Sequence, residues 1–273
     1  MGYQKLTKEQ EQQLVQEYIE GTPVHVLMEK YGFKTKKSIA DKVKKYGGEN
    51  AIEEAKKNRK TYSIAFDGVT NQFNAYFLGL MLTDGYIIDE NKFGIELTDE
   101  DCIQFLSEVT QKKYHTYEAT GLGVKKRHRI IFSDRQSVKK LAEYGVVPNK
   151  TKILGKVPLS LEEEKFIPYI IRGIIDGDGS VFKTGYGAPA FYVCSASENF
   201  IYWLKQIFEE KLFFQDMSVS KSSKDLWRLD CANQRNILKL IALVYDKPYG
   251  MNRKYSLIRE MFRDYNRDNL LLS

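Results

Sequence analysis

Residues 171–180 read IRGIIDGDGS, an apolar run that stops abruptly at two aspartates separated by a glycine. An earlier stretch, FLGLMLTDGY at residues 77–86, also places Asp-Gly after an apolar run and before a β-type segment. The repeat makes Asp84 equivalent to Asp178, 94 positions later. A helix C-terminus carries partial negative charge and unpaired carbonyls, so a carboxylate there is unfavourable without a positive partner. Both stretches therefore predict helix ends with a chemical role.

Three weaker sequence matches follow in the same order. They are IELTDEDCIQFL and VCSASENFIYWL from residues 95 and 193, SDRQSVKKL and ANQRNILKL from residues 133 and 232, and NKTKIL and NRKYSL from residues 149 and 252. Matches in a constant order predict an internal duplication with a pseudo-two-fold axis.

Each half reads as helix, two strands, helix, two strands, helix, which predicts an α+β fold. The segments with strand character are residues 92–97, 123–132, 190–193, 217–220 and 227–231. Their patterning predicts sheets with a core on one side and a polar, basic face on the other.

Small residues recur four positions apart in the helix of each repeat. Gly79 and Thr83 lie on one face of the first helix, and Gly173 and Gly177 lie on the same face of the second. Small side chains at this spacing let two helix backbones approach closely. We therefore expect the two helices to pack in parallel, with the two aspartates side by side.

Two anions at abutting helix ends repel by roughly a few kcal/mol in a partly buried site. A divalent ion offsets this repulsion through both carboxylates, the backbone oxygens just before them, and water. The chain has 3 Cys and 3 His, and none has zinc-ligand spacing. Oxygen ligands favour Mg²⁺ or Ca²⁺, and Mg²⁺ beside few carboxylates is typical of phosphoryl transfer. The sequence therefore predicts a phosphodiester substrate.

Other interpretations of the Asp-Gly pairs compete with a metal site. Asp-Gly is a frequent hairpin turn, and TDGYI alone fits that interpretation. DGDGS begins like an EF-hand loop, but Val181 replaces the glycine at position six and Gly187 replaces the glutamate at position twelve. Gly173 also fits a role in helix packing alone. Recurrence of the same small-residue helix before both pairs favours the metal site.

Residues 77–85, FLGLMLTDG, and 171–179, IRGIIDGDG, resemble the nine-residue signature of the LAGLIDADG homing endonucleases. The second copy matches strongly, whereas the first has Leu82 where the signature has its earlier acid. Both copies keep the later acid and the final glycine. The similarity extends from about residue 66 to residue 262.

This resemblance implies a pseudo-symmetric αββαββα pair whose two four-stranded sheets form a saddle on DNA. It implies cleavage of both strands across the minor groove with short 3′ overhangs, as in intron homing. Asp84 and Asp178, with the carbonyls of Thr83 and Gly177, would hold Mg²⁺, and Ca²⁺ would bind without supporting cleavage. The expected partner is double-stranded DNA with a long, largely asymmetric target, bound by a monomer.

The family also places a basic and a glutamine-like side chain near each scissile phosphate. The nearest positions here are Arg135 with Gln136 and Arg235 with Gln234, and Glu96 or Cys194 is a further choice for the polar position. Basic residues of the predicted sheets are expected to contact DNA: Lys126, Arg127, Arg129, Lys183, Lys221, Lys224 and Arg228.

The N-terminal residues predict three short helices with a tight turn before the last, a helix-turn-helix pattern. Thr7 caps the first helix, Thr22-Pro23 starts the second, and Thr35 caps the third over residues 36–46. In the third helix Ile39 and Val43 would pack inward. The outward residues, expected on DNA, are Lys36, Lys37, Ser38, Lys42 and Lys45. The segment resembles resolvase-like helix-turn-helix domains.

We therefore expect a helix-turn-helix domain over residues 1–47, a basic linker over 48–72, and LAGLIDADG domains over 73–158 and 159–273. The net charge of +6 fits a polyanionic partner. No apolar run has the length of a membrane span, and MGYQKLTKEQ lacks the apolar core of a signal peptide. A non-secreted protein is expected, in the cytoplasm or in an organelle or nucleoid compartment that holds the target.

Together these features predict a site-specific, Mg²⁺-dependent endonuclease that makes double-strand breaks. The alternative is a DNA-binding regulator or an RNA maturase that keeps the scaffold without catalysis. Retention of both Asp84 and Asp178 favours the enzyme.

Overall fold

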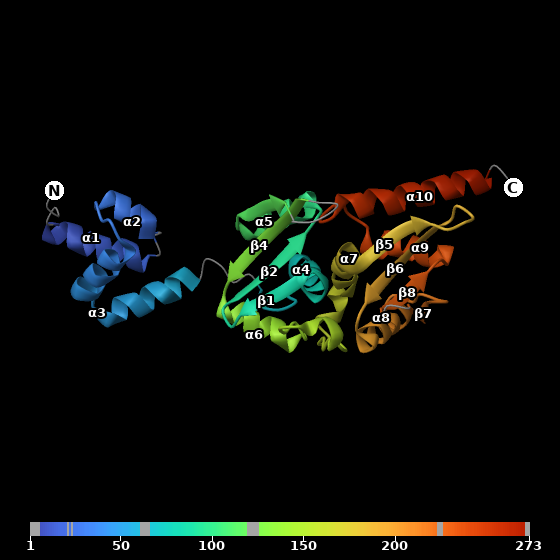
Figure 1. The fold of residues 1–273 in the computed structure, drawn as a ribbon, viewed down its shortest axis with the longest axis horizontal. Helices are drawn as coiled ribbons and strands as arrows, with labels where there is room; N and C mark the ends of the chain where they lie inside the picture. The colour runs from blue at the N-terminus through green and yellow to red at the C-terminus, as the bar shows by residue number, and fades with distance from the viewer. Residues whose placement is uncertain are drawn as a thin grey trace. The chain divides into compact units, whose positions relative to one another are not determined.

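The structure is a computed structural model that describes residues 6–20, 22, 24–60, 66–118, 126–222 and 226–270. The chain divides into two compact units, Met1–Ile64 and Ala65–Ser273, each with its own hydrophobic core (Figure 1). In the described part of the chain, every helix is too short or too polar to cross a membrane.

The first unit contains the helices α1 (Lys8–Ile19), α2 (Val24–Lys30) and α3 (Lys36–Lys60). Thr7 caps α1 through reciprocal bonds with Gln10. Thr35 caps α3 by accepting a bond from the backbone N–H of Ser38 at 3.2 Å. Both caps satisfy backbone donors that the first turn of a helix leaves unpaired.

The core of the first unit joins all of its helices. Leu14 of α1, Leu27 of α2, and Ile39 and Val43 of α3 are fully buried. The inward positions predicted for Ile39 and Val43 are confirmed. The assignment of this unit as a helix-turn-helix domain stays a prediction.

Of the linker predicted for residues 48–72, residues 48–60 are helical. Helix α3 continues through this segment, with non-helical backbone at Gly48 (φ 73°). Ala51 and Ala55 give it a small apolar face that packs into the first core. Phe66 already lies in the core of the second unit.

The second unit contains two halves with the same order of elements. The first half comprises α4 (Gln72–Thr83), β1 (Gly85–Asp89), β2 (Lys92–Leu97), α5 (Glu100–Thr110), β3 (Tyr114–Glu118), β4 (Lys126–Ser133) and α6 (Arg135–Glu143). The second half comprises α7 (Ile167–Asp178), β5 (Gly179–Lys183), β6 (Pro189–Ser195), α8 (Glu198–Glu210), β7 (Ser218–Lys221), β8 (Trp227–Cys231) and α9 (Gln234–Lys239). The α+β fold and the duplication are thereby confirmed.

Short helical turns and a long terminal helix complete the unit. They are η1 (Lys150–Lys152), η2 (Glu164–Phe166), η3 (Leu240–Val244) and α10 (Asn252–Leu270). Figure 1 shows α10 running along one edge of the second half, beside β5.

Each half forms a four-stranded antiparallel sheet, with strand orders β1-β2-β4-β3 and β5-β6-β8-β7. Gly85 pairs with Ile95 in the first sheet, and Gly179 pairs with Val193 in the second. Since both glycines directly follow the signature aspartates, the two sheets start from their helices in the same register.

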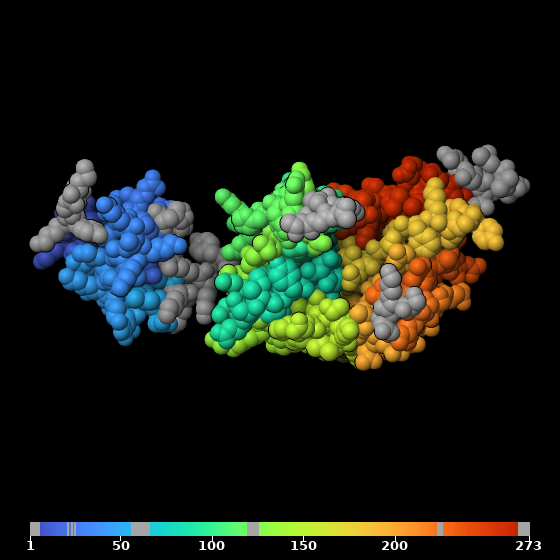
Figure 2. All heavy atoms as spheres, in the orientation of Figure 1, coloured from blue at the N-terminus to red at the C-terminus, as the bar shows by residue number. Residues whose placement is uncertain are grey.

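Helices α4 and α7 pack side by side between the two sheets (Figure 1). A Cβ on Gly79 would lie 2.2 Å from the carbonyl oxygen of Ile170, and one on Gly173 would lie 2.3 Å from that of Tyr76. The backbones are therefore in direct contact, as the small-residue spacing predicts. Figure 2 shows the two halves packed against one another where coloured atoms of both are visible.

The segment that follows each half contacts the other half. The Ser197 hydroxyl, at the N-cap of α8, donates to the carbonyl of Leu154. Arg253 of α10 donates to Asp99, at the N-cap of α5, with N···O distances of 2.8 and 3.1 Å. These crossed contacts hold the two halves in one unit.

Candidate active site

Asp84 and Asp178 stand where the two signature helices end. Asp84 is the C-cap residue of α4, and Asp178 is the last residue of α7. The helix ends abut so closely that a Cβ on Gly177 would lie 2.4 Å from the Asp84 Oδ2 and 2.0 Å from the Thr83 Oγ1. The juxtaposition expected from the paired small residues is present.

The charge of Asp178 acts on the carboxyl group of Asp84. The pKa of Asp84 is raised to about 6, first by burial and then by the charge of Asp178. Burial also raises the pKa of Asp178, which has the more accessible side chain, while Lys150 and Lys254 oppose that rise. A cation placed between the two groups would lower both pKa values.

Two buried lysines, absent from the sequence predictions, support the helix ends. The Lys150 Nζ donates to the carbonyl oxygens of Thr83 at 3.1 Å and Gly85 at 2.6 Å. Burial lowers the pKa of Lys150, and the two aspartates oppose this effect. The lysine satisfies carbonyls that the end of α4 leaves unpaired.

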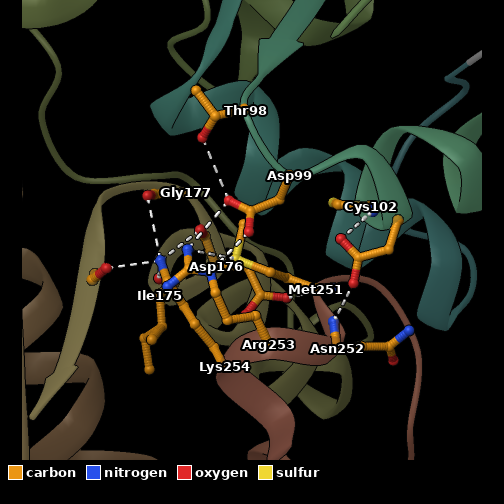
Figure 3. A network of polar contacts seen from close by, with 12 residues as sticks. Thr98, Asp99, Cys102, Ile175, Asp176, Gly177, Met251, Asn252, Arg253 and Lys254 are labelled. Carbon is orange, nitrogen blue, oxygen red and sulfur yellow. Dashed lines mark hydrogen bonds and ion pairs between the residues drawn. The ribbon is translucent and has the colours of Figure 1, made fainter. Parts of the chain in front are cut away.

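Lys254 has the corresponding place at the end of α7 (Figure 3). Its Nζ donates to the carbonyl oxygens of Ile175, Asp176 and Gly179 at 2.8, 2.6 and 2.6 Å, with Gly177 at 3.5 Å. The sequence match of NKTKIL with NRKYSL pairs Lys150 with Arg253, one residue short of the structural counterpart. The basic residues that both segments contain were the signal from which these two lysines could have been predicted.

These lysines correct one step of the sequence argument. A divalent ion was expected to be the compensation for the two aspartates. Lys150 and Lys254 already place two positive charges at the helix ends, and both lower the pKa of Asp84. The site is therefore close to charge balance before any ion binds.

The earlier acid of the second signature, Asp176, points away from the helix junction. It is fully buried and accepts bonds from the hydroxyls of Tyr76 at 2.9 Å and Tyr245 at 2.7 Å. The backbone N–H of Met251 donates to it at 3.3 Å (Figure 3). Asp176 thus fixes the chain at the start of α10, three residues before Lys254.

A cavity of about 340 Å³ opens beside Asp84. Glu96 and Arg127 line it from the first sheet, and Ser180 lines it from β5. Lys254 borders it from α10. The cavity thus brings Asp84 together with side chains of the first sheet and with Lys254, which follows the second half.

Comparison with known proteins assigns the fold. Neither a protein-family model nor a curated protein sequence matches the chain. The solved structure of the homing endonuclease I-WcaI bound to its DNA recognition sequence aligns with 70% of this chain and 88% of its own, with a TM-score of 0.54 and 14% identity. The two halves form a two-domain LAGLIDADG fold.

Two further structures align less closely. The LAGLIDADG meganuclease I-AabMI bound to uncleaved DNA covers 72% of this chain and 92% of its own, with a TM-score of 0.45 and 10% identity. The N-terminal LAGLIDADG domain of DUF199/WhiA covers 68% and 86%, with a TM-score of 0.45 and 11% identity.

In this LAGLIDADG fold, the basic and glutamine residues predicted beside the aspartates lie elsewhere. Arg135 is exposed at the start of α6 and lies 3.6 Å from Glu90, in the turn after β1, while Gln136 is exposed next to it. Strand β1 separates this turn from Asp84 by five residues, about 17 Å of extended chain. Arg135 and Gln136 are therefore not brought to the site.

The second half repeats this arrangement. Gln234 donates to the carbonyl of Pro189 at 3.0 Å, where β6 starts at the end of the sheet remote from Asp178. Arg235 is exposed beside it. The prediction for these residues is wrong because α6 and α9 follow β4 and β8, and both strands end at the edge of the sheet that is remote from the aspartates.

Strand alternation divides the predicted DNA-contacting residues between the two faces of each sheet. Ile130 and Leu229 are buried against the helices, so Arg127, Arg129 and Arg228 project from the open face. The same alternation places Lys126, Lys183 and Lys221 on the helix-covered face, where Lys183 lies 3.6 Å from Asp264 of α10. Lys224 lies outside the described residues.

Register identifies a basic residue common to both halves. Arg129 pairs with Glu96 in the first sheet, and Arg228 pairs with Cys194 in the second. Arg228 stacks on Tyr192 at 3.8 Å from the ring centroid and bonds Asp230 at 2.7 Å. The alternatives Glu96 and Cys194 thus hold equivalent positions, and the arginines pair with them.

In the first unit, the predicted DNA-contacting residues lie along the start of α3. Lys36, Lys37 and Lys45 are exposed, and Ser38 and Lys42 are partly exposed. The ammonium groups of Lys42 and Lys45 lie 5.3 and 5.2 Å from the ring centroid of Tyr46. The helix therefore presents cations around an aromatic ring.

The donor set fits a hard divalent ion with water in its coordination sphere. Asp84 and Asp178 offer carboxylate oxygens, and the carbonyls of Thr83 and Gly177 already accept bonds from lysines. Among the described residues, no three His, Cys, Asp or Glu side chains gather closely enough to enclose an ion. Two carboxylates with water and phosphate oxygens match the habit of Mg²⁺.

Proposed function

We propose that the protein is a site-specific, metal-dependent endonuclease that cuts both strands of DNA. The observation that carries the proposal is the pair Asp84 and Asp178 on abutting helix ends, each end held by its own buried lysine. The DNA-bound state of I-WcaI, which has the same fold, supports a DNA partner.

A divalent ion held by Asp84 and Asp178, Mg²⁺ in our proposal, would supply Lewis acidity to the phosphate, and Ca²⁺ would bind without supporting cleavage. Lys150 and Lys254 keep the carbonyls of the helix ends paired and place positive charge near the phosphate oxygens. Ionised Asp84 and Asp178 are needed for ion binding, so the raised pKa of Asp84 sets a lower pH limit. Hydrolysis would leave 3′ overhangs.

The open faces of the sheets would contact the DNA on either side of the cut. Arg127 and Arg129 project from the first sheet, and Arg228 projects from the second, where Tyr192 and Phe182 flank it. Guanidinium groups bind phosphates and read guanine edges bidentately. Because the faces differ in sequence, a long and largely asymmetric target follows, bound by a monomer.

The first unit would act as a second DNA-binding module. Its exposed lysines on α3 would bind phosphates or the major groove in a helix-turn-helix manner. Tethering on one chain raises the effective concentration of each module near the DNA that the other has bound.

The decisive experiment uses a supercoiled plasmid that carries the DNA flanking this reading frame. In Mg²⁺ the wild-type protein should convert it to linear DNA with one fixed cut site, and in Ca²⁺ it should bind without cutting. Asp178→Asn should abolish double-strand cleavage while DNA binding stays within about twofold. An uncut plasmid, or full cleavage by Asp178→Asn, contradicts the proposal.

One observation favours the non-catalytic alternative. Lys150 and Lys254 match the two aspartates in number of charges and lower the pKa of Asp84, so they supply part of the compensation that a bound ion would otherwise give. A regulator or an RNA maturase with this scaffold would bind nucleic acid in Mg²⁺ and leave the plasmid intact.

A further inference from the structure

The two halves differ at positions that the sheet register makes equivalent. Glu96 pairs with Arg129, and Cys194 pairs with Arg228. Two residues before each arginine, the first half has Arg127 and the second has Leu226. The halves therefore share an aspartate, a lysine and an arginine, but not the side chains next to them.

In the first half these side chains form a charged cluster. Glu96 accepts bonds from the Tyr117 hydroxyl at 2.5 Å and from Arg127 at 2.9 Å. Burial alone would raise the pKa of Glu96, but the bonds from Tyr117 and Arg127 bring it below its usual value. An ionised carboxylate and a guanidinium thus stand on the wall of the cavity that contains Asp84.

In the second half the same positions carry no charge. Burial raises the pKa of Cys194, which keeps the thiol neutral near pH 7. Leu226 is 36% exposed and offers no hydrogen-bonding side chain. This pair can neither hold a phosphate by charge nor accept a strong hydrogen bond from water.

We propose that the two halves cut their strands at unequal rates. This inference rests on the proposed endonuclease function and assigns the first cut to the half with Asp84, Glu96 and Arg127. An incoming phosphate attracts Arg127 away from Glu96, and the freed carboxylate orients the attacking water. The water oxygen bonds to phosphorus and the water gives a proton to the solvent, while the bond to the leaving oxygen breaks and that oxygen takes up a proton from the solvent.

A strand-resolved assay tests the proposal on the supercoiled plasmid with the flanking DNA, in Mg²⁺. Nicked circles should precede linear DNA, with one strand cut about tenfold faster than the other. Glu96→Gln should slow the faster strand at least about tenfold and remove the order. Glu118→Gln, on the helix-covered face of the same sheet, is the matched control and should change neither rate.

Copying the second half into the first provides an independent variant. Glu96→Cys combined with Arg127→Leu should bring the two strand rates within about twofold of each other. Equal strand rates in the wild-type protein, or an unchanged ratio in the double variant, overturn the inference.

A readout without cleavage separates this inference from the proposed function. Mn²⁺ binding to the DNA-free protein, followed by electron paramagnetic resonance, should weaken about threefold or more in Glu96→Gln, because a negative charge leaves the cavity wall. Glu118→Gln should bind Mn²⁺ as the wild-type protein does, and Asp84→Asn should lose the site.

An uncut plasmid defeats the proposed function and, with it, the strand order. Unchanged Mn²⁺ affinity in Glu96→Gln defeats the inference even when cleavage occurs. Absence of Mn²⁺ binding to the wild-type protein defeats both.

Discussion

Lys150 and Lys254 perform the same task at the two signature helix ends. Lys150 bonds the carbonyls of Thr83 and Gly85, and Lys254 contacts those of Gly177 and Gly179, 94 positions later in each case. The lysines themselves are 104 positions apart. The second half therefore reaches the equivalent atoms through a longer chain segment.

Replacing these lysines should damage both stability and cleavage. Lys254→Met leaves the carbonyls at the end of α7 unpaired and should lower the free energy of unfolding by about 3 kcal/mol. Lys150→Met, which frees two carbonyls, should cost less. Denaturant unfolding of both variants checks this order, and Lys156→Met, on an exposed side chain of the connecting segment, is the control. Equal losses for all three would contradict it.

The pKa of Asp84 predicts how pH acts on metal binding. Because the carboxyl has a pKa of about 6, Mg²⁺ must displace a proton below that pH. Affinity should fall by up to about tenfold per unit as pH drops below 6. Calorimetric titrations with Mg²⁺ between pH 5 and 8 measure the slope. A flat profile across pH 6 would show that Asp84 is not the controlling group.

The same pKa has a consequence for stability without metal. The folded pKa of about 6 exceeds the ordinary value of 3.8, so Asp84 favours folding below about pH 4 and loses this contribution as pH rises through 6. Asp84→Asn should therefore be more stable than the wild-type protein above pH 6, by about 1–3 kcal/mol. Thermal unfolding in EDTA at pH 5 and pH 8 tests this, and a gain larger at pH 5 would refute it.

The glycines at the helix crossing should tolerate no side chain. Gly79→Ala or Gly173→Ala sets a methyl group against a main-chain oxygen, at 2.2 or 2.3 Å, and neither backbone can retreat. We expect a loss of about 3 kcal/mol or more in the free energy of unfolding. Gly155→Ala, which meets open space, should change it by less than about 0.5 kcal/mol. Near-native unfolding of Gly79→Ala would argue against direct backbone contact.

The buried pair Arg172 and Asp176 is found in the second half, whereas Leu78 and Leu82 hold the equivalent positions of the first. Arg172 is fully buried, donates to the carbonyls of Lys247 and Tyr249, and lies 3.7 Å from Asp176. Removing one partner leaves a buried charge unpaired, so Arg172→Leu should cost about 3–5 kcal/mol.

The variant with both Arg172→Leu and Asp176→Leu should regain part of that loss, because neither charge remains buried. It should still lose the anchor that Asp176 gives to Met251 at the start of α10. Urea unfolding of the single and double variants forms a double-mutant cycle. A double variant no more stable than Arg172→Leu would show that the anchor dominates.

Deleting residues 1–64 removes the first compact unit. We expect Mg²⁺-dependent cleavage of the plasmid to persist, while DNA affinity falls about tenfold or more through loss of a tethered module. Gel-shift titration and the strand assay measure the two effects separately. Complete loss of nicking with an intact fold would show that the first unit is part of the catalytic apparatus.

Much of the fold was predictable because the determining signals are local or periodic. The Asp-Gly repeat and the small-residue spacing predict both the duplication and the helix crossing, and strand alternation predicts the sheets. The helix over residues 48–60 was not predicted because the polar composition of this segment concealed the small apolar face formed by Ala51 and Ala55. Two buried alanines are enough to dock this helix, although the segment is otherwise polar.

The site was predictable only in part. Asp84 and Asp178 follow from the repeat, but Lys150 and Lys254 reach the helix ends from distant segments, and side chains 65 to 79 positions away make those contacts. Arg135 and Arg235 were misplaced because closeness along the chain says nothing about which end of a sheet a residue occupies.

The contact between Gly79 and Gly173 also bears on how such a chain can evolve. A larger residue cannot be accommodated at either glycine, so we expect these two positions to change little during evolution. Side chains on the open faces of the sheets are not confined in this way. Because each half is encoded by a separate stretch of the gene, the two faces can change independently. New target sequences would therefore arise by independent substitutions on the two sheets, while the crossing of α4 and α7 stays unchanged.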